Sequence, residues 1–210
     1  MATSRENKTL SQFKSNLLGG GARPNLFEVE LTTLPSGIQW DAEVFRYLCK
    51  AAALPASNIA QIDVPFRGRI FKVAGDRTFD VWQITVINDE DFKIRTAFEE
   101  WMNLISKLDN NMGATDPSAY MTNATVYQLG RGSQKASTDA SGSSNAVLKE
   151  YEFVDIFPTA ISAIDLSYDT SDAIEEFTVD FQVQSFSMTV SYTHLRAHET
   201  REDRGWRVVG

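Results

Sequence analysis

Hydrophobic and polar residues alternate along several short segments of the chain, which is the period of half-buried β-strands. In Asn25–Thr33, the apolar residues Phe27, Val29 and Leu31 alternate with glutamates and other polar residues. The same pattern runs through Phe177–Gln184. Further strands are predicted around Trp40 and at Tyr47–Ala52, Ile59–Phe66, Ile70–Val73, Phe79–Ile87, Tyr120–Leu129, Val147–Ile156 and Ile164–Tyr168.

One segment, Asn88–Lys107, has the spacing of an amphipathic helix instead. Its apolar residues recur at intervals of three and four, giving one apolar stripe: Ile94, Ala97, Phe98, Trp101, Leu104, Ile105 and Leu108. Asn88 or Asp89 can cap its first turn, and the acidic residues that follow suit the positive end of a helix. The pattern also allows a short helix near Leu10–Leu18.

Glycine, proline and small polar residues mark the connections between these elements. We expect turns at Arg67–Arg69 and Asp169–Asp172, a loop at Gly75–Thr78, and a long Gly/Ser-rich loop at Gly130–Asn145. Pro158 is expected to end the strand before it. The turn at Asp169–Asp172 would join Ile164–Tyr168 and Phe177–Gln184 in an antiparallel hairpin.

These elements predict a mainly β (α+β) fold, an antiparallel β-sandwich or barrel with one flanking α-helix. Residues 25–188 would form this domain, and residues 1–24, which contain Gly19–Gly21 and Pro24, would form a flexible N-terminal arm. A sheet of this kind has open edges unless something covers them, and a partner subunit can add to such an edge.

Composition narrows the classes of function. The chain has 210 residues with 28 acidic and 20 basic side chains, a net charge of −8, which argues against a broad basic surface for nucleic acid. No apolar run approaches the roughly 20 residues that span a bilayer, and the polar N-terminus lacks the apolar core of a signal peptide. The single cysteine, Cys49, is expected to be a small buried hydrophobic residue.

The C-terminal segment 189–210 differs from the rest of the chain. Val190–Thr200 resembles a translated sequencing adapter, so we interpret 189–210 as a non-native, adapter-derived tail. The segment holds both histidines of the chain, His194 and His198. Two histidines four residues apart could bind a metal on a helix, but no third ligand lies nearby in the sequence.

Without that tail the chain has no histidine, which removes the most frequent general acid or base of enzymes. Three pairs of glutamates remain as candidates for carboxylate catalysis, at 28 and 30, 99 and 100, and 175 and 176. We interpret each pair as the solvated side of a strand or helix, because no motif provides a nucleophile or a metal beside it. The sequence Gly130–Gly132 lacks the rest of a dinucleotide-binding motif. We therefore expect neither enzymatic activity nor a cofactor.

Four segments resemble the tail tube protein of contractile-tailed, myovirus-type bacteriophages. They are Ala22–Phe27, Cys49–Pro55, Val73–Phe79 and Ile87–Glu90, and they occur in the order that the family has. The run Val-Ala-Gly-Asp-Arg-Thr-Phe at 73–79 is the most specific of them. The resemblance extends over about residues 22–188.

The resemblance implies a structural subunit that forms hexameric rings, which stack into a hollow tube inside a contractile sheath. In the family, long β-hairpins from six subunits join into a continuous barrel that lines the channel. The implied partners are further copies of the chain, the tail sheath protein, and the baseplate and tail-terminator proteins. DNA would pass through the lumen during ejection without specific binding, and the subunit itself would bind no membrane. The location would be the virion tail, after synthesis in the host cytoplasm. A tube protein of a related contractile injection or type VI secretion system is the alternative.

Two sets of residues are candidates for roles in such a tube. Asp76, Arg77, Thr78 and Phe79 would form a subunit-interface loop, with an ordinary hairpin turn as the alternative interpretation. Asp165 and Asp180 would face the lumen on one side of the later hairpin, where six copies give rings of negative charge. Alternatively, these acids lie on an outer face and only aid solubility.

The adapter interpretation predicts that the tail contributes nothing to folding. Deletion of residues 193–210 should leave the melting temperature unchanged, because this polar, Arg-rich segment has little apolar surface to bury against the entropy of ordering it. Thermal unfolding of the full and shortened chains tests this. A fall of several degrees, on the order of 1 kcal/mol for a domain of this size, would show that the segment is part of the native fold.

Overall fold

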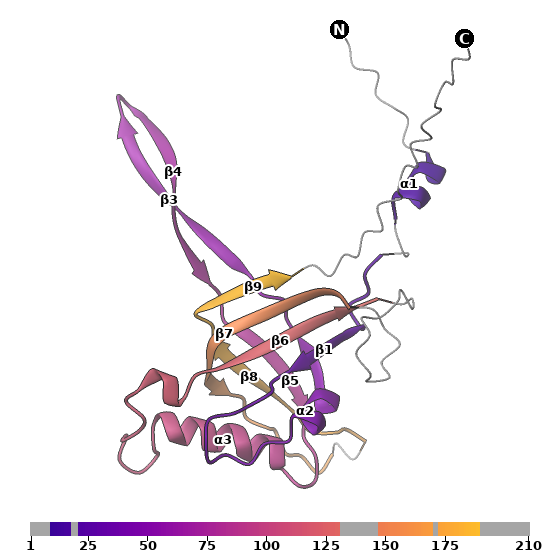
Figure 1. The fold of residues 1–210 in the computed structure, drawn as a ribbon, viewed down its shortest axis with the longest axis vertical. Coiled ribbons are helices and arrows are strands. Elements are labelled where there is room, and N and C mark those ends of the chain that lie inside the picture. Colours follow the sequence, from indigo (N-terminus) through magenta and orange to yellow (C-terminus); the bar gives the residue numbers. More distant parts are fainter. Residues whose placement is uncertain (1–8, 18–20, 131–146, 170–171, 190–210) are drawn as a thin grey trace, which may run out of the picture.

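The computed structural model describes residues 9–17, 21–130, 147–169 and 172–189. Within these ranges the chain is built mainly of antiparallel strands, with short helices at one end of the sheet and near the N-terminus (Figure 1). The elements are α1 (Leu10–Asn16), β1 (Phe27–Glu30), α2 (Ala42–Leu48), β2 (Cys49–Ala52), β3 (Ser57–Phe66), β4 (Arg69–Phe79), β5 (Trp82–Ile87), α3 (Lys93–Ile105), the 3-10 turn Pro117–Ala119, β6 (Thr122–Leu129), β7 (Val147–Ile161), β8 (Glu176–Gln182) and β9 (Ser185–Thr189).

Seven strands form one open sheet in the order β1-β6-β7-β8-β5-β2, with β9 also paired to β7. The long strand β7 connects the two halves of this sheet. Its first part pairs with β6 and β9, and its last part pairs with β8. Asp155, with φ of 55°, interrupts β7 between these parts, as a bulge does when a strand bends from one sheet into another. The mainly β class is confirmed, although the sheet does not close into a barrel.

The core is formed by the inward-facing residues of the sheet together with α2 and α3. Phe98 and Trp101 of α3 are fully buried, and each ring centroid lies 5.9 Å from that of Phe181 on β8. On β5, Trp82 stacks on Phe153 of β7 at 4.3 Å. The predicted apolar stripe is therefore confirmed as a packing face at Ile94, Ala97, Phe98 and Trp101, whereas Leu108 lies beyond the helix and is 89% exposed. The helix begins at Lys93, later than predicted, because Asn88, just after β5, still pairs with the segment before β8: its backbone N–H donates to the Glu175 carbonyl at 2.9 Å.

A second helix stands where the sequence predicted a strand around Trp40. Asp41 caps α2 by accepting hydrogen bonds from the backbone N–H groups of Glu43 and Val44 at 3.1 Å. Phe45 is fully buried and packs against Trp40 at 5.0 Å between ring centroids. The local cap and this aromatic contact together favour helix here, so the prediction of a single flanking helix was wrong.

The predicted loop at Gly75–Thr78 is also wrong, because these residues lie inside β4. Strands β3 and β4 pair along their length. Ser57 lies opposite Phe79 at one end and Phe66 lies opposite Arg69 at the other, with one register shift between Ile59 and Gln61. At that irregularity a side chain on Gly75 would have its Cβ only 3.1 Å from the Ala60 carbonyl oxygen. The glycine therefore serves a close backbone approach at a bulge rather than a turn.

The hairpin predicted from Ile164–Tyr168 is not formed. That segment contains no strand, and β8 pairs instead with β5 and with the end of β7. Strand β7 continues past Pro158 to Ile161, since the missing N–H of the proline falls at a register irregularity. The neighbour of β8 is thus a continuation of an earlier strand, which local alternation could not reveal.

Other predictions are confirmed. Strands β1, β2 and β6 lie within their predicted ranges, the turn at Arg67–Arg69 forms, and α1 occupies the predicted short helix. Cys49 is 8% exposed, and burial raises the pKa of its thiol to about 12. Of the predicted Gly/Ser-rich loop Gly130–Asn145 only Gly130 is described, and of the 189–210 tail only Thr189, so both predictions lie outside the described residues.

Candidate assembly surface

The most conspicuous feature of the molecule is a two-stranded arm, residues Ser57–Phe79, made of β3 and β4. Figure 1 shows it projecting from the sheet, and it forms a separate two-stranded sheet. Strand β3 follows β2, and β4 precedes β5, so the arm continues a hairpin whose base is part of the main sheet. The 10 residues of β3 correspond to a reach of about 30 Å.

The base of the arm is fixed to the body by specific contacts. Phe79 packs edge-on against Phe186 of β9, with 5.3 Å between ring centroids. The Asn58 side chain donates to Asp80 at 2.8 Å, and the Trp82 indole N–H donates to the Ala53 carbonyl at 2.9 Å. The arm therefore leaves the body at a defined place and direction.

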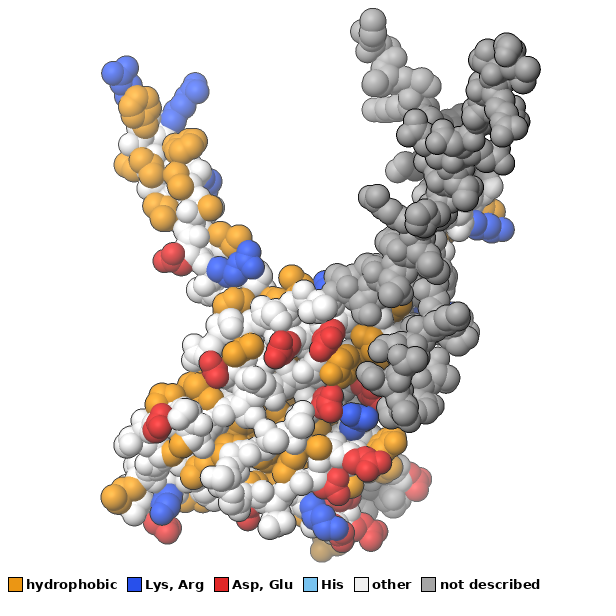
Figure 2. All heavy atoms as spheres, viewed as in Figure 1, with side chains coloured by type: hydrophobic (Ala, Val, Ile, Leu, Met, Phe, Trp, Pro, Cys, Tyr) orange, Lys and Arg blue, Asp and Glu red, His pale blue; other side chains and the backbone are white. Residues whose placement is uncertain are grey.

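One face of the arm is apolar and exposed. Directly opposed residues of an antiparallel pair share a face, so Ile62 and Val73 lie together, as do Val64 and Phe71. We define the apolar arm face by its five large side chains, each 41–67% exposed: Ile62, Val64, Phe66, Phe71 and Val73. Figure 2 shows hydrophobic side chains along the whole arm.

The opposite arm face is mixed. Gln61, Asp63 and Lys72 lie in its middle, and the Lys72 ammonium is 3.7 Å from the Asp63 carboxylate. At the tip, Arg67 and Gly68 both have positive φ, as a tight two-residue hairpin turn requires. The Arg67 guanidinium lies 5.4 Å from the centre of the Phe66 ring.

A two-stranded hairpin is at best marginally stable by itself in water. The apolar arm face adds large exposed hydrophobic surface, which in soluble proteins marks an interaction site. The sequence analysis missed it because the alternation of Ile62, Val64 and Phe66 indicated a half-buried strand of the domain core. That alternation was the correct signal for one apolar face, but it does not tell which molecule covers the face.

The structure places the four predicted interface residues at the base of the arm. Asp76, Arg77 and Thr78 are exposed within β4, and Arg77 lies opposite Ile59. Phe79 is half-buried and makes the contact with Phe186 described above. The four residues thus divide into three on the surface and one that anchors the arm to its own chain.

The two predicted lumen acids are not brought together on one hairpin. Asp165 is exposed in the connection between β7 and β8. Asp180 lies on β8, where its neighbours Val179 and Phe181 point into the core, so its side chain is on the outer face of the sheet. It accepts a hydrogen bond of 2.7 Å from the Gln83 side chain of β5.

A different group of acids shares one outer face across β1, β6 and β7. The register aligns Glu28 with Tyr127 and Glu150, and aligns Glu30 with Thr125 and Glu152. We call the four glutamates the acidic face. The sequence analysis had only Glu28 and Glu30, as the solvated side of a strand, because their alignment with β7 depends on β6 between them.

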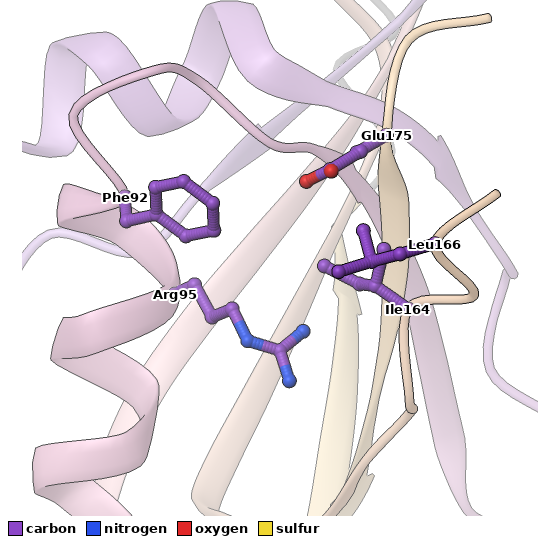
Figure 3. Close-up of a pocket in the computed structure, with 5 residues that line it drawn as sticks. All are labelled: Phe92, Arg95, Ile164, Leu166 and Glu175. Atoms are coloured by element: carbon purple, nitrogen blue, oxygen red, sulfur yellow. The ribbon is translucent and has the colours of Figure 1, made fainter. Parts of the chain in front are cut away.

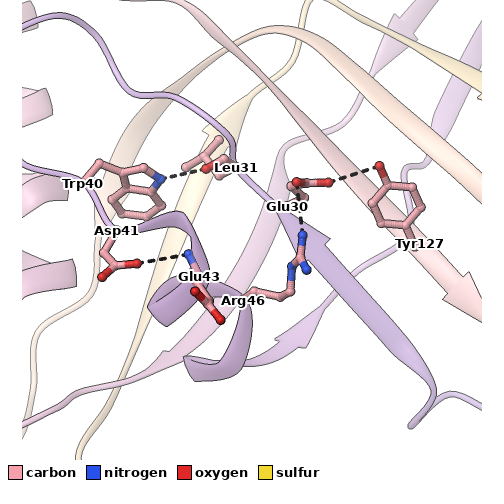
Figure 4. Close-up of polar contacts among 7 residues, drawn as sticks. All are labelled: Glu30, Leu31, Trp40, Asp41, Glu43, Arg46 and Tyr127. Carbon is pink, nitrogen blue, oxygen red and sulfur yellow. Dashed lines mark hydrogen bonds and ion pairs between the residues drawn. The ribbon is translucent and has the colours of Figure 1, made fainter. Parts of the chain in front are cut away.

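The acidic face is held to α2 at one edge. The Arg46 guanidinium is 3.1 Å from the Glu30 carboxylate, which also accepts a hydrogen bond of 3.2 Å from the Tyr127 hydroxyl (Figure 4). Partial burial, together with the charges of Glu30 and Glu150, raises the pKa of Tyr127 to about 12. The tyrosine therefore stays protonated and donates to the carboxylate at neutral pH.

The described residues contain no cluster of histidine, cysteine, aspartate or glutamate arranged to bind a metal. Within the same ranges, no helix is long and apolar enough to cross a membrane.

Comparisons with known proteins agree with this geometry. The family described as phage tail tube protein matches residues 22–189. The chain is 37% identical to the tail tube protein gp19 of Enterobacteria phage T4 over 161 residues, which cover 77% of this chain and 88% of that protein. It is 23% identical to the tail tube protein of Serratia phage KSP90, over 83% of this chain and 93% of that protein.

Solved structures show the same fold at low sequence identity. A chain from the baseplate of the anti-feeding prophage is similar with a TM-score of 0.57 and 10% identity, covering 81% of this chain and 96% of that one. A chain from the tube-terminating cap of the same particle has a TM-score of 0.54 and 15% identity, covering 91% of this chain and all of that one. Since the family match covers most of the sequence, the chain belongs to the phage tail tube proteins, structural components of the virion tail.

Proposed function

We propose that this chain is the repeating subunit of the tail tube of a contractile-tailed phage, that six copies form a ring, and that stacked rings conduct DNA during ejection. The observation that carries the proposal is the apolar arm face, which no other described part of the chain covers. In a ring, the arms of neighbouring copies lie side by side and cover one another's apolar surface. The backbone of the two outer arm edges can also pair, as exposed strand edges do.

The other proposed partners of the subunit are the tail sheath protein around the tube and the baseplate and terminator proteins at its ends. The fold likeness to chains from the baseplate and cap of the anti-feeding prophage supports these partners. The alternative, a tube of a contractile injection or type VI secretion system, shares the fold. The greater identity to phage tail tube proteins favours the phage tail. A structural, non-enzymatic role is part of the proposal.

The proposed role of the arm predicts that a glutamate introduced on its apolar face and one introduced on its opposite face have different effects. Ile62→Glu should abolish ring formation, because it places a charge in the apolar contact between arms. Gln61→Glu, one residue away on the opposite face, should leave rings intact. Sedimentation velocity and negative-stain electron microscopy measure assembly, and thermal melting of the dissociated subunit controls for folding. Normal rings from the Ile62→Glu variant would contradict the role of the apolar arm face.

Asp76, Arg77 and Thr78 extend the proposed interface to the base of the arm. Arg77→Ala should weaken ring assembly more than it changes the melting temperature, because Arg77 is exposed and lies on a strand that the ring would cover. The matched variant Phe79→Ala should lower the melting temperature, since it removes the contact with Phe186. Equal losses of assembly and of stability in Arg77→Ala would reject the interface role.

We also propose that Asp165 and Asp180 face the lumen. Asp180 shares the outer face of β8 with uncharged Thr178 and Gln182 and accepts a hydrogen bond from Gln83, so this part of the wall is polar with few cations. A wall without cations provides no counterpart for DNA phosphates, so the DNA can slide. Physiological salt limits the field of these carboxylates to about 8 Å, which confines the effect to DNA close to the wall.

Lysine substitutions test the two aspartates, Asp165 and Asp180, independently of each other. Asp180→Lys and Asp165→Lys should each increase the DNA retained by assembled tubes at low salt, and added salt should reverse the increase. Glu100→Lys is the control, because α3 packs on the core-facing side of the sheet, whereas Asp180 lies on its outer side. Retention measured after nuclease digestion of external DNA gives the comparison. A variant that retains no more DNA than the Glu100→Lys control would show that its position does not face the lumen.

A further inference from the structure

The short helix α1 has an apolar stripe with nothing packed on it. Leu10, Phe13 and Leu17 recur at spacings of three and four, and they are 68%, 62% and 43% exposed. None of the residues of α1 is buried. A helix of 7 residues is marginal in water, so a packing partner for this stripe would be its main source of stability.

The local sequence nevertheless stabilises the first turn of this helix. Thr9 and Gln12 form a reciprocal capping box, in which the Gln12 N–H donates to the Thr9 hydroxyl and the Thr9 N–H donates to the Gln12 side chain. The sequence thus specifies a helix at this position, and its apolar stripe is a defined surface rather than a random segment.

A groove at the other end of the molecule is lined by apolar side chains and by charged ones. Phe92 and Arg95 at the start of α3 form one side, and Ile164, Leu166 and Glu175 from the β7–β8 connection form the other (Figure 3). Its volume of about 240 Å³ is below the roughly 300–1,000 Å³ of pockets for small molecules, so it fits side chains better than a ligand. Leu166 is 80% exposed on its rim.

Phe92 gives a second indication that this groove has a partner. Its backbone is left-handed, with φ of 54° and ψ of 17°, a conformation that is unfavourable for a bulky residue. The side chain makes no capping hydrogen bond and is 44% exposed, so neither the helix start nor the core requires the ring there. In Figure 3 the ring is turned toward the groove.

The helix α1 and the groove also carry opposite charges. Lys14 follows Phe13 on α1, which places it beside the apolar stripe. In the groove, Glu175 accepts a hydrogen bond from the Asn88 side chain at 3.0 Å, and among the described residues neither Lys14 nor Glu175 has an ion-pair partner. Arg95 is already held, with its guanidinium 2.9 Å from Glu99 and over the Phe177 ring.

We propose that α1 of one copy docks into this groove of a copy in the next ring, with Phe13 against Phe92 and Leu166, and Lys14 beside Glu175. Figure 1 places α1 at the end of the molecule where the arm projects, and α3 at the opposite end, so one chain does not bring its own helix to its own groove. A contact between two different surfaces either closes into a ring or repeats as an open stack, and surfaces at opposite ends of the subunit favour the stack. The inference rests on the proposed stacked rings.

Two variants with the same added charge test the contact by electron microscopy and sedimentation. Phe13→Glu should leave single rings but lower the association constant between rings by at least about tenfold, so that stacks become shorter at the same concentration. Ser15→Glu, on the opposite side of α1, should stack like the parent chain. Parent-like stacks from Phe13→Glu, or equal loss of stacking in both variants, would overturn the inference while the proposed function stands. A parent chain that forms neither rings nor stacks would overturn the proposed function and this inference with it.

A cross-linking experiment reports the contact directly. A chain carrying both Phe13→Cys and Leu166→Cys is oxidised with diamide, and the native Cys49 does not interfere because it is buried with a raised pKa. Head-to-tail docking gives a ladder of covalent multimers on a non-reducing gel, whereas docking within one chain gives a cross-linked monomer. The control chain has Ser15→Cys with Leu166→Cys and should give no ladder. A cross-linked monomer, or equal ladders from both chains, would overturn the inference.

Discussion

The arm sets the main physical problem of this structure, because none of the described residues covers its apolar face. A strand pair gains stability from a third strand or from packing against another layer, and β3 and β4 have neither. Cutting the arm short would remove the exposed hydrophobic surface, yet the chain keeps it about 30 Å long. Among the described residues the arm is thus left uncovered, and the proposed ring would cover it with further copies of the same chain.

The body of the molecule is built so that this arm has a fixed direction. Its strands continue β2 and β5, and the inner face of β5 is held by Trp82, which stacks on Phe153. Strand β7 bends at Asp155 so that β8 and β9 lie along it one after the other, and this places Phe186 of β9 under Phe79 of the arm. The aromatic core around Phe181 therefore supports an interface element that lies outside the core.

The sequence revealed what depends on local pattern and missed what depends on distant pairing. The stripe of Phe98 and Trp101 predicted α3, and the alternation around Val29 and Val179 predicted strands whose inner residues are indeed buried. Alternation in Ile164–Tyr168 has the same period, but β7 had already filled the place beside β8. Likewise, Gly75 was taken for a turn because nothing in the local sequence shows that Ala60 passes close to it.

The same distinction between local pattern and distant pairing applies to the candidate assembly surface. Its chemistry was visible in the sequence: apolar residues at every second position of 62–66, and an acidic excess that gives each copy a charge of −8. The interactions that join such copies must overcome the repulsion between their negative charges. Apolar contacts do so because they act at short range and do not depend on the sign of charge, whereas the repulsion between acidic surfaces is screened within about 8 Å at physiological salt. In the proposed tube, subunits can therefore hold together through the apolar face of β3 and β4 while carboxylates elsewhere on the subunit repel DNA, since the two tasks use different physical interactions on different parts of the chain.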